Sequence, residues 1–223
     1  MSFIVAIDGP AGAGKGTVTQ ILSKKLNLVN IDTGATYRCV ALQALREKVS
    51  LEETDKIIEI AENIKIQMDE EQRIFLNGEN VTRQIREKEV SKIVSQVSTI
   101  KEVRYKMVEL QRKMAEGKNV IMEGRDITTY VFPNADVKIY LDATEAERIK
   151  RRFEEMEEKG IFMTYEEVAE NIRARDYNDT HKEIGSLKKA EDAIIVDSTG
   201  KTIDEVAMQI EKIIREKMKQ CLE

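Results

Sequence analysis

The sequence predicts an α/β fold in which helices flank a five-stranded parallel sheet. The first observation is a set of short apolar runs without polar alternation, which is typical of strands buried on both faces. These runs are Phe3–Ile7, Leu28–Ile31, Val120–Met122, Val137–Leu141 and Ala193–Val196. The second observation is that helical patterns separate the runs. Such alternation implies right-handed crossovers between parallel strands.

Length, composition and charge narrow the function further. A chain of 223 residues fits one domain, residues 1–223. The net charge of −5 argues against a nucleic-acid partner. No apolar run approaches the roughly 18 residues of a membrane helix, and the first strand begins near the N-terminus. We therefore expect a cytoplasmic protein with no signal peptide and no membrane partner.

Cysteine and histidine are too scarce for several kinds of site. Cys39 and Cys221 are too few and too far apart for a disulfide framework or a cysteine metal site. His181 is the only histidine. A histidine-centred catalytic triad or a multi-histidine metal site is therefore not expected.

A glycine-rich loop follows the first predicted strand and leads into a helical pattern. Its residues are Gly9, Pro10, Ala11, Gly12, Ala13, Gly14, Lys15, Gly16 and Thr17. Glycines let backbone N–H groups converge on phosphate oxygens, and the helix directs its positive end at the same anion. Lys15 can reach the outer phosphates. We predict a nucleoside triphosphate site, in which Gly16 stands where the general motif has a Mg²⁺-ligating hydroxyl.

Between the second and third predicted strands, one region follows a different pattern. Apolar residues alternate over 64–68 and again over 74–76, and Asp69–Gln72 separates the two stretches. Asn77-Gly78 then gives a strong turn signal. We predict a small antiparallel sheet inserted between helices.

Local signals mark several helix ends. A helix is predicted over Lys101–Glu116, closed by Gly117. Capping boxes predict three further helix starts. They pair Thr144 with Glu147, Thr164 with Glu167, and Thr202 with Glu205.

Polar segments follow the second and third strands, at Asp32–Arg38 and Glu123–Asp126. Ligands of open α/β sheets bind outside the carboxyl ends of the strands, so both segments should face the crevice of the phosphate loop. Arg38 and Arg125 are suited to clamp a second phosphate, because a guanidinium binds two of its oxygens at once.

The whole chain resembles the bacterial cytidylate kinase family, within the nucleoside monophosphate kinases. The matching segments are Gly9–Thr17, Asp32–Arg38, Ser95–Val97, Glu123–Asp126, Val131–Pro133 and Asp197–Thr199. The antiparallel insertion matches the enlarged monophosphate-binding insert of that family. The resemblance implies a P-loop kinase with a core (1–60, 100–147 and 184–223), an insert (about 61–99) and a helical lid (about 148–183).

The resemblance also implies an activity. It is phosphoryl transfer from ATP to CMP and to dCMP, giving CDP or dCDP and ADP, within pyrimidine nucleotide metabolism. Mg²⁺ would accompany ATP, with Asp32 as a contact through water and no direct protein ligand. The family further suggests a monomer.

Site roles follow from the same resemblance. Lys15, Arg125 and Arg151 are implied to be catalytic, and Arg148 and Arg152 to bind ATP together with the loop. CMP contacts are implied for Thr33, Arg38, Ser95, Arg104, Arg125, Asp126, Arg175, Asp179 and Lys182. Ser95, Arg104 and Asp126 would read the cytosine. The arginines at 148, 151 and 152 share one helix face, which fits a lid closing over phosphates.

Some features depart from the family pattern or leave alternatives open. Lys182 and Ser186 stand where relatives usually carry Arg and Pro, and Thr128 replaces a Gly. Lysine keeps the charge but loses the planar fork. The acceptor could instead be UMP, AMP or a small non-nucleotide molecule. A guanine-reading switch is disfavoured because no Asn-Lys-x-Asp segment occurs.

Overall fold

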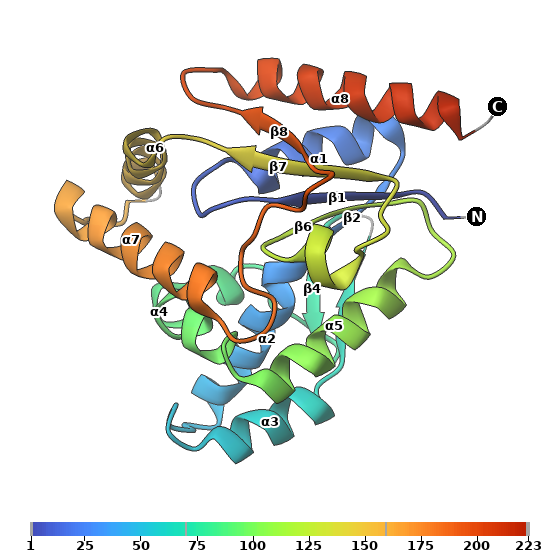
Figure 1. Cartoon of the computed structure of the whole chain (residues 1–223). Coiled ribbons are helices and arrows are strands. Elements are labelled where there is room, and N and C mark those ends of the chain that lie inside the picture. The colour runs from blue at the N-terminus through green and yellow to red at the C-terminus, as the bar shows by residue number, and fades with distance from the viewer. Residues whose placement is uncertain (1, 70, 159, 222–223) are drawn as a thin grey trace.

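The five apolar runs form one parallel sheet with the strand order β2–β6–β1–β7–β8 (Figure 1). The computed structural model describes residues 2–69, 71–158 and 160–221. The strands are β1 (Ile4–Asp8), β2 (Val29–Asp32), β6 (Val120–Gly124), β7 (Val137–Asp142) and β8 (Ile194–Asp197). Each begins within one residue of its predicted start. The predicted fold class is confirmed.

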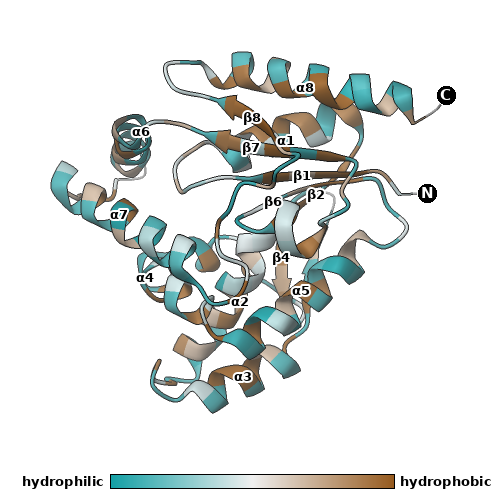
Figure 2. Cartoon of the chain, viewed as in Figure 1, coloured by the Kyte–Doolittle hydropathy of each residue, from teal (hydrophilic) through white to brown (hydrophobic). Residues whose placement is uncertain are grey.

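Helices cover both faces of the sheet at its central strands β1 and β6, which explains why these two strands read as continuous apolar runs. The prediction of burial on both faces is wrong for β7, whose buried residues alternate with partly buried ones, and for the edge strand β8, where Ile194 and Ile195 are exposed. On β1, Val5 and Ile7 pack toward α1 (Lys15–Leu26) and α8 (Ile203–Gln220). The intervening Ala6 packs toward the opposite face, under α5 (Lys101–Ala115) and the π-helical turn η2 (Ile127–Val131). Figure 2 shows the brown, apolar strands between these mixed-colour helices. In the part of the chain that the structure describes, no helix has the length and apolarity to cross a membrane.

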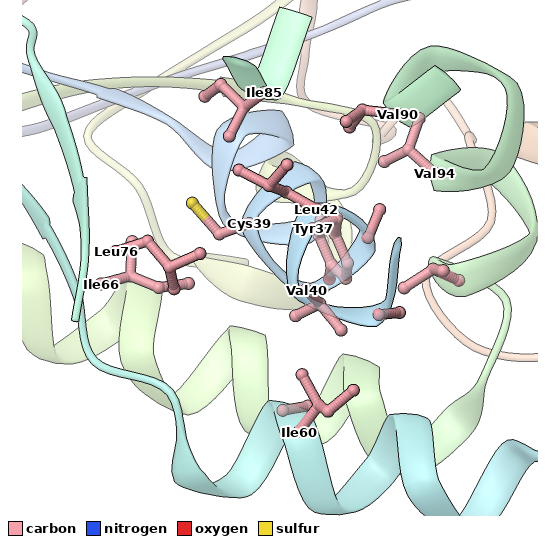
Figure 3. Close-up of a cluster of buried hydrophobic side chains, with 14 of the residues drawn as sticks. Tyr37, Cys39, Val40, Leu42, Ile60, Ile66, Leu76, Ile85, Val90 and Val94 are labelled. Atoms are coloured by element: carbon pink, nitrogen blue, oxygen red, sulfur yellow. The ribbon is translucent and has the colours of Figure 1, made fainter. Parts of the chain in front are cut away.

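A second core lies around α2 (Thr33–Arg46), beyond β2. Figure 3 shows Tyr37, Val40 and Leu42 of this helix inside a cluster of apolar side chains from the surrounding elements. Those elements are α3 (Thr54–Asn63), the 3-10 turn η1 (Gln84–Arg86), α4 (Lys88–Val97), α5 and part of the inserted sheet. This core fixes the orientation of α2 and α4, which both reach the crevice described below.

The inserted sheet is antiparallel and has the order β3–β4–β5. Its strands are β3 (Ile66–Met68), β4 (Ile74–Leu76) and β5 (Glu79–Asn80). The register pairs Ile66 with Leu76, and both side chains are buried. Asn77 and Gly78 have φ of 51° and 88°, as the predicted Asn-Gly turn requires. Within the predicted turn Asp69–Gln72, Glu70 lies outside the described residues.

Two helices, α6 (Glu145–Glu158) and α7 (Tyr165–His181), lie beyond the carboxyl ends of the strands (Figure 1). They pack on each other through a small apolar cluster that includes Ile149 and Val168. The predicted capping boxes at Thr164 and Thr202 are both present. The far end of α7 reaches α4, so this helix spans the mouth of the crevice.

Candidate active site

The predicted site residues gather around a crevice of about 690 Å³ at the carboxyl ends of the parallel strands. Its wall combines the glycine-rich loop with residues from α2, α4, α5, α6 and α7. The predicted residues that line it are Ala11–Thr17, Asp32, Thr33, Arg38, Ser95, Arg104, Arg125, Asp126, Arg151, Arg152, Arg175, Asp179 and Lys182. Gly9, Pro10 and Arg148 are not among the residues that line the crevice, but each takes part in hydrogen bonds that hold the loop.

The glycine-rich loop leaves β1 and ends at the start of α1. Gly9 has no room for a side chain, because a Cβ would lie 2.0 Å from the carbonyl oxygen of Leu141. Gly14 is the N-cap of α1 with φ of 89°, which only glycine adopts readily. The Lys15 ammonium donates to the carbonyl oxygens of Gly9 (2.7 Å) and Pro10 (2.9 Å). Burial lowers the pKa of Lys15, and Arg125 nearby adds to this shift.

Arg148 supports the loop from behind rather than facing the crevice. It is buried and donates to the carbonyl oxygens of Ala11 (3.0 Å) and Ala143 (3.2 Å). It also pairs with Asp176 of α7. A Cβ on Gly12 would lie 3.1 Å from the Cβ of Arg148. The geometry therefore gives Arg148 a different position from the two other arginines of the predicted lid.

Arg151 and Arg152 do face the crevice. Arg151 donates to the Ser198 hydroxyl (3.0 Å) and carbonyl (2.6 Å), and it pairs with Glu147. Arg152 pairs with Glu155 at 2.7 Å. Arg151 is thus held by α6 and by the loop after β8, and Arg152 is held by α6.

Two neighbouring carboxylates line the crevice, and only one of them, Asp32, had been predicted from the sequence to contact Mg²⁺ through water. Asp32 and Glu123 are neighbours in the register of β2 and β6. Desolvation raises the pKa of Glu123, and the charge of Asp32 adds to the rise. A Cβ on Gly16 would lie 2.8 Å from Oε1 of Glu123. The absence of a side chain at position 16 therefore leaves room for the Glu123 carboxylate.

These oxygens fit a magnesium ion that keeps much of its water. Mg²⁺ prefers oxygen ligands and dehydrates reluctantly. Within the described residues, no group of three or more His, Cys, Asp or Glu side chains could hold a metal by itself. Asp32 and Glu123 can instead accept hydrogen bonds from metal-bound waters while nucleotide phosphates ligate the ion.

Three arginines from three elements form a second cationic group. Arg38 comes from α2, Arg125 follows β6 and Arg175 comes from α7. Desolvation and the charge of Arg125 lower the pKa of Arg175, although its side chain is 39% exposed and solvent weakens the effect. Burial likewise lowers the pKa of Arg38. Such crowding of like charge is unfavourable without an anion, so the cluster is suited to bind one.

Asp179 pairs with several cations in and around this cluster. Its carboxylate accepts from Nε of Arg125 (2.6 Å) and from Nζ of Lys182 (2.8 Å). These cations, together with Arg175 at 4.0 Å, hold the pKa of Asp179 well below its usual range despite burial. The Lys182 ammonium is buried and donates to Asp179 in this arrangement. Thr33 lines the crevice nearby and donates to the Glu123 carbonyl oxygen at 2.7 Å.

The predicted base-reading residues Ser95, Arg104 and Asp126 line the same crevice as the loop. Arg104 is only 2% exposed; it pairs with Asp126 and donates to the carbonyl oxygen of Ser98 (3.2 Å). Its guanidinium lies 5.4 Å from the centre of the Tyr37 ring. Among the described residues, the buried Arg104 Nε has no hydrogen-bond partner. The ion pair presents a carboxylate and a planar cation side by side.

Asp8 fixes the turn that carries Asp126. Its buried carboxylate accepts from the backbone N–H of Ile127 (2.9 Å) and from the N–H and hydroxyl of Thr128 (2.7 and 2.6 Å). Burial outweighs these bonds and raises the pKa of Asp8 to about 6. The hydroxyl of Thr128 therefore contributes to the support of the turn that carries Asp126.

Gly185 lies against the Arg104–Asp126 pair and was not singled out from the sequence. Its φ is 64°, and a Cβ there would lie 2.1 Å from both Nη2 of Arg104 and Oδ2 of Asp126. The glycine backbone thus packs directly on the ion pair. The only sequence signal for Gly185 is its place shortly after the predicted contact residues Asp179 and Lys182. Its contact partners could not be read from the sequence, because they lie far away along the chain.

We expect Gly185→Ala to raise the KM for the acceptor at least tenfold, because the new methyl group must push the Arg104–Asp126 pair apart. Gly117→Ala is the matched control: Gly117 has a similar φ of 69°, yet a Cβ added there would meet nothing within 4 Å. Both variants carry the same backbone strain, roughly 1 kcal/mol. Steady-state kinetics should separate them; equal KM values would contradict the close-packing argument.

The fold and the loop together define the class of protein, an α/β P-loop kinase. A model of the family described as cytidylate kinase matches residues 5–216. The cytidylate kinase of Caldicellulosiruptor saccharolyticus is 48% identical over 92% of each chain. That of Clostridioides difficile is 47% identical over 94% of this chain and 96% of its own. The chain belongs to the cytidylate kinase family, whose members are phosphotransferases with a phosphate group as acceptor.

A solved structure shares the fold. It is an uncharacterized protein from Eubacterium ventriosum, with a TM-score of 0.53 and 12% sequence identity. The match covers 96% of this chain and 99% of that one. At this identity the likeness concerns the fold alone.

Proposed function

We propose that this chain transfers the γ-phosphoryl group of ATP to CMP and dCMP, giving ADP and CDP or dCDP. The observation that carries the proposal is the Arg104–Asp126 pair, which lines the same crevice as the phosphate loop. Cytosine offers an amino group that a carboxylate accepts, and N3 and O2 acceptors that suit a guanidinium. The family membership supports the same substrate.

The base preference follows from matching donors and acceptors. Uracil presents a carbonyl where cytosine has its amino group, so the Asp126 carboxylate would face an acceptor. A buried group left without its partner costs about 1–3 kcal/mol. Ser95, on α4 at the crevice wall, contributes a hydroxyl to the same reading.

The transfer requires positioning more than acid–base chemistry. The second pKa of a phosphate monoester is near ~6, so the acceptor oxygen is mostly deprotonated at neutral pH and needs no general base. This oxygen forms the new bond to the γ-phosphorus as the bond to the β-phosphate oxygen breaks. Arg38, Arg125 and Arg175 would hold the acceptor phosphate in line. Lys15 and Arg151 would stabilise negative charge on the transferring group.

Mg²⁺ is proposed as the ion that accompanies ATP. When bound, it would neutralise charge on the nucleotide phosphates. Asp32 and Glu123 would orient its waters, since Glu123 lies against Gly16 of the loop and Asp32 lies beside Glu123 in the sheet.

We further propose that the chain consists of three parts with different roles. The sheet and its helices (1–60, 100–147 and 184–223) form the core, residues 61–99 the monophosphate-binding insert and residues 148–183 the lid. Closure of the lid would exclude water from the reacting phosphates. A cytoplasmic monomer is proposed on the resemblance to the family.

An ADP-release assay with ATP and Mg²⁺ tests the function, with CMP, dCMP, UMP and AMP compared as acceptors. We expect kcat/KM for CMP and dCMP to exceed that for UMP by roughly 10- to 100-fold, the equivalent of one unpaired buried group. Equal use of UMP would retain the kinase but remove Asp126 as the discriminating residue. Turnover with none of the four would overturn the proposed substrate.

A further inference from the structure

Helix α7 contacts two separate parts of the crevice through side chains that lie three residues apart. Asp176 accepts a hydrogen bond from the backbone N–H of Ala11 in the phosphate loop, at 3.4 Å. Asp179, nearly one turn further along, accepts from Arg125 at the acceptor side. A single helix therefore contacts both the glycine-rich loop and Arg125.

Asn178, between these two residues, reaches a third part of the crevice. Its Nδ2 donates to the hydroxyl oxygen of Ser95 at 3.2 Å. Ser95 belongs to α4, 83 positions away in sequence, and lines the crevice near Arg104. Figure 1 shows the C-terminal half of α7 next to α4, where this contact is made.

The contact restricts the Ser95 hydroxyl. A serine hydroxyl has one hydrogen to donate and two lone pairs that accept, and its side chain can occupy three rotamers. The Asn178 amide takes one lone pair and fixes the direction of the oxygen. One hydrogen and one lone pair are left for a ligand in the crevice.

We propose that Asn178 is a positioning residue for base recognition, which acts by orienting the Ser95 hydroxyl toward the nucleobase. The proposal rests on the proposed function, in which Ser95 contacts the base. It assigns to α7 a role in acceptor recognition that adds to its ties to the phosphate loop and to Arg125. The base reading then depends on α7 being in place over the crevice.

Four variants test this role: Asn178→Ala, Ser95→Ala, the double variant, and Asn171→Ala as a control. Asn171 is also an asparagine of α7, but it is exposed and donates to the carbonyl oxygen of Glu167 within the same helix. We expect Asn178→Ala to raise the KM for CMP roughly three- to tenfold, the range for one lost neutral hydrogen bond. The KM for ATP should not change, and Asn171→Ala should match the unmodified protein.

The double variant separates positioning from general support of the helix. If Asn178 acts through Ser95, removing it from the Ser95→Ala protein should cause no further rise in the KM for CMP. Multiplicative effects, an unchanged KM for CMP in Asn178→Ala, or an equal rise in the KM for ATP would each overturn the proposal. Failure of the proposed function has a different signature, because the unmodified protein itself would then not prefer CMP.

Discussion

Lys15→Ala is expected to lower kcat by roughly 10²- to 10³-fold, the usual cost of removing one preorganised charge from a transition state. Lys15 is the ammonium within the glycine-rich loop, at the start of α1. Its two hydrogen bonds go to carbonyl oxygens of that loop, so the ammonium is held beside the backbone that would cradle phosphate. Burial lowers the pKa of this amine, which means that burial disfavours its protonated form. The negative charge of a bound phosphate would favour the protonated form again.

The measurement is kcat by ADP release, together with thermal unfolding of the variant. Lys24→Ala is the matched control, since Lys24 lies on the same helix but is exposed in its last turn. The fold should survive in both variants, because the sheet core does not depend on the ammonium. Near-normal turnover of Lys15→Ala would contradict its assignment to the transferring phosphate.

The sheet and the loop were predictable because their causes are local in the sequence. The run Val120–Met122 is buried on both faces, as expected of a central strand in a covered parallel sheet. The loop was equally predictable, because Gly14 adopts a positive φ next to Lys15, which favours glycine at that position. The Asn77-Gly78 turn determined the small sheet in the same way. Each of these signals is complete within a few residues.

Other features of the site depend on contacts between segments that are distant in sequence. Gly185 has no room for a side chain, because its backbone packs on Arg104 and Asp126. Nothing near Arg148 indicated that its guanidinium would bind the carbonyl oxygen of Ala11, 137 positions away. The Glu123 carboxylate gains its position from the absence of a side chain at Gly16. Such partners emerge only when the sheet brings the strand ends together.

Arg125→Ala is expected to have an effect as large as that of Lys15→Ala, but on the acceptor side. Its guanidinium lines the crevice between the loop and Asp179, where it belongs to the arginine cluster suited to an anion. Loss of the planar fork removes both the charge and the alignment of the acceptor phosphate. We expect kcat/KM for CMP to fall by at least roughly 10²-fold. Arg125→Lys should recover part of this loss, because it keeps the charge without the fork.

The fold of Arg125→Ala should remain intact, since Lys182 still pairs with the Asp179 carboxylate at 2.8 Å. Arg215→Ala, which removes an exposed arginine of α8, is the control and should leave turnover unchanged. The two large predictions differ in a measurable way. Arg125→Ala should raise the KM for CMP, whereas Lys15→Ala should act on kcat with little change in that KM. If Arg125→Ala instead raised only the KM for ATP, Arg125 would belong to the donor side and the acceptor clamp would have to be built from Arg38 and Arg175 alone.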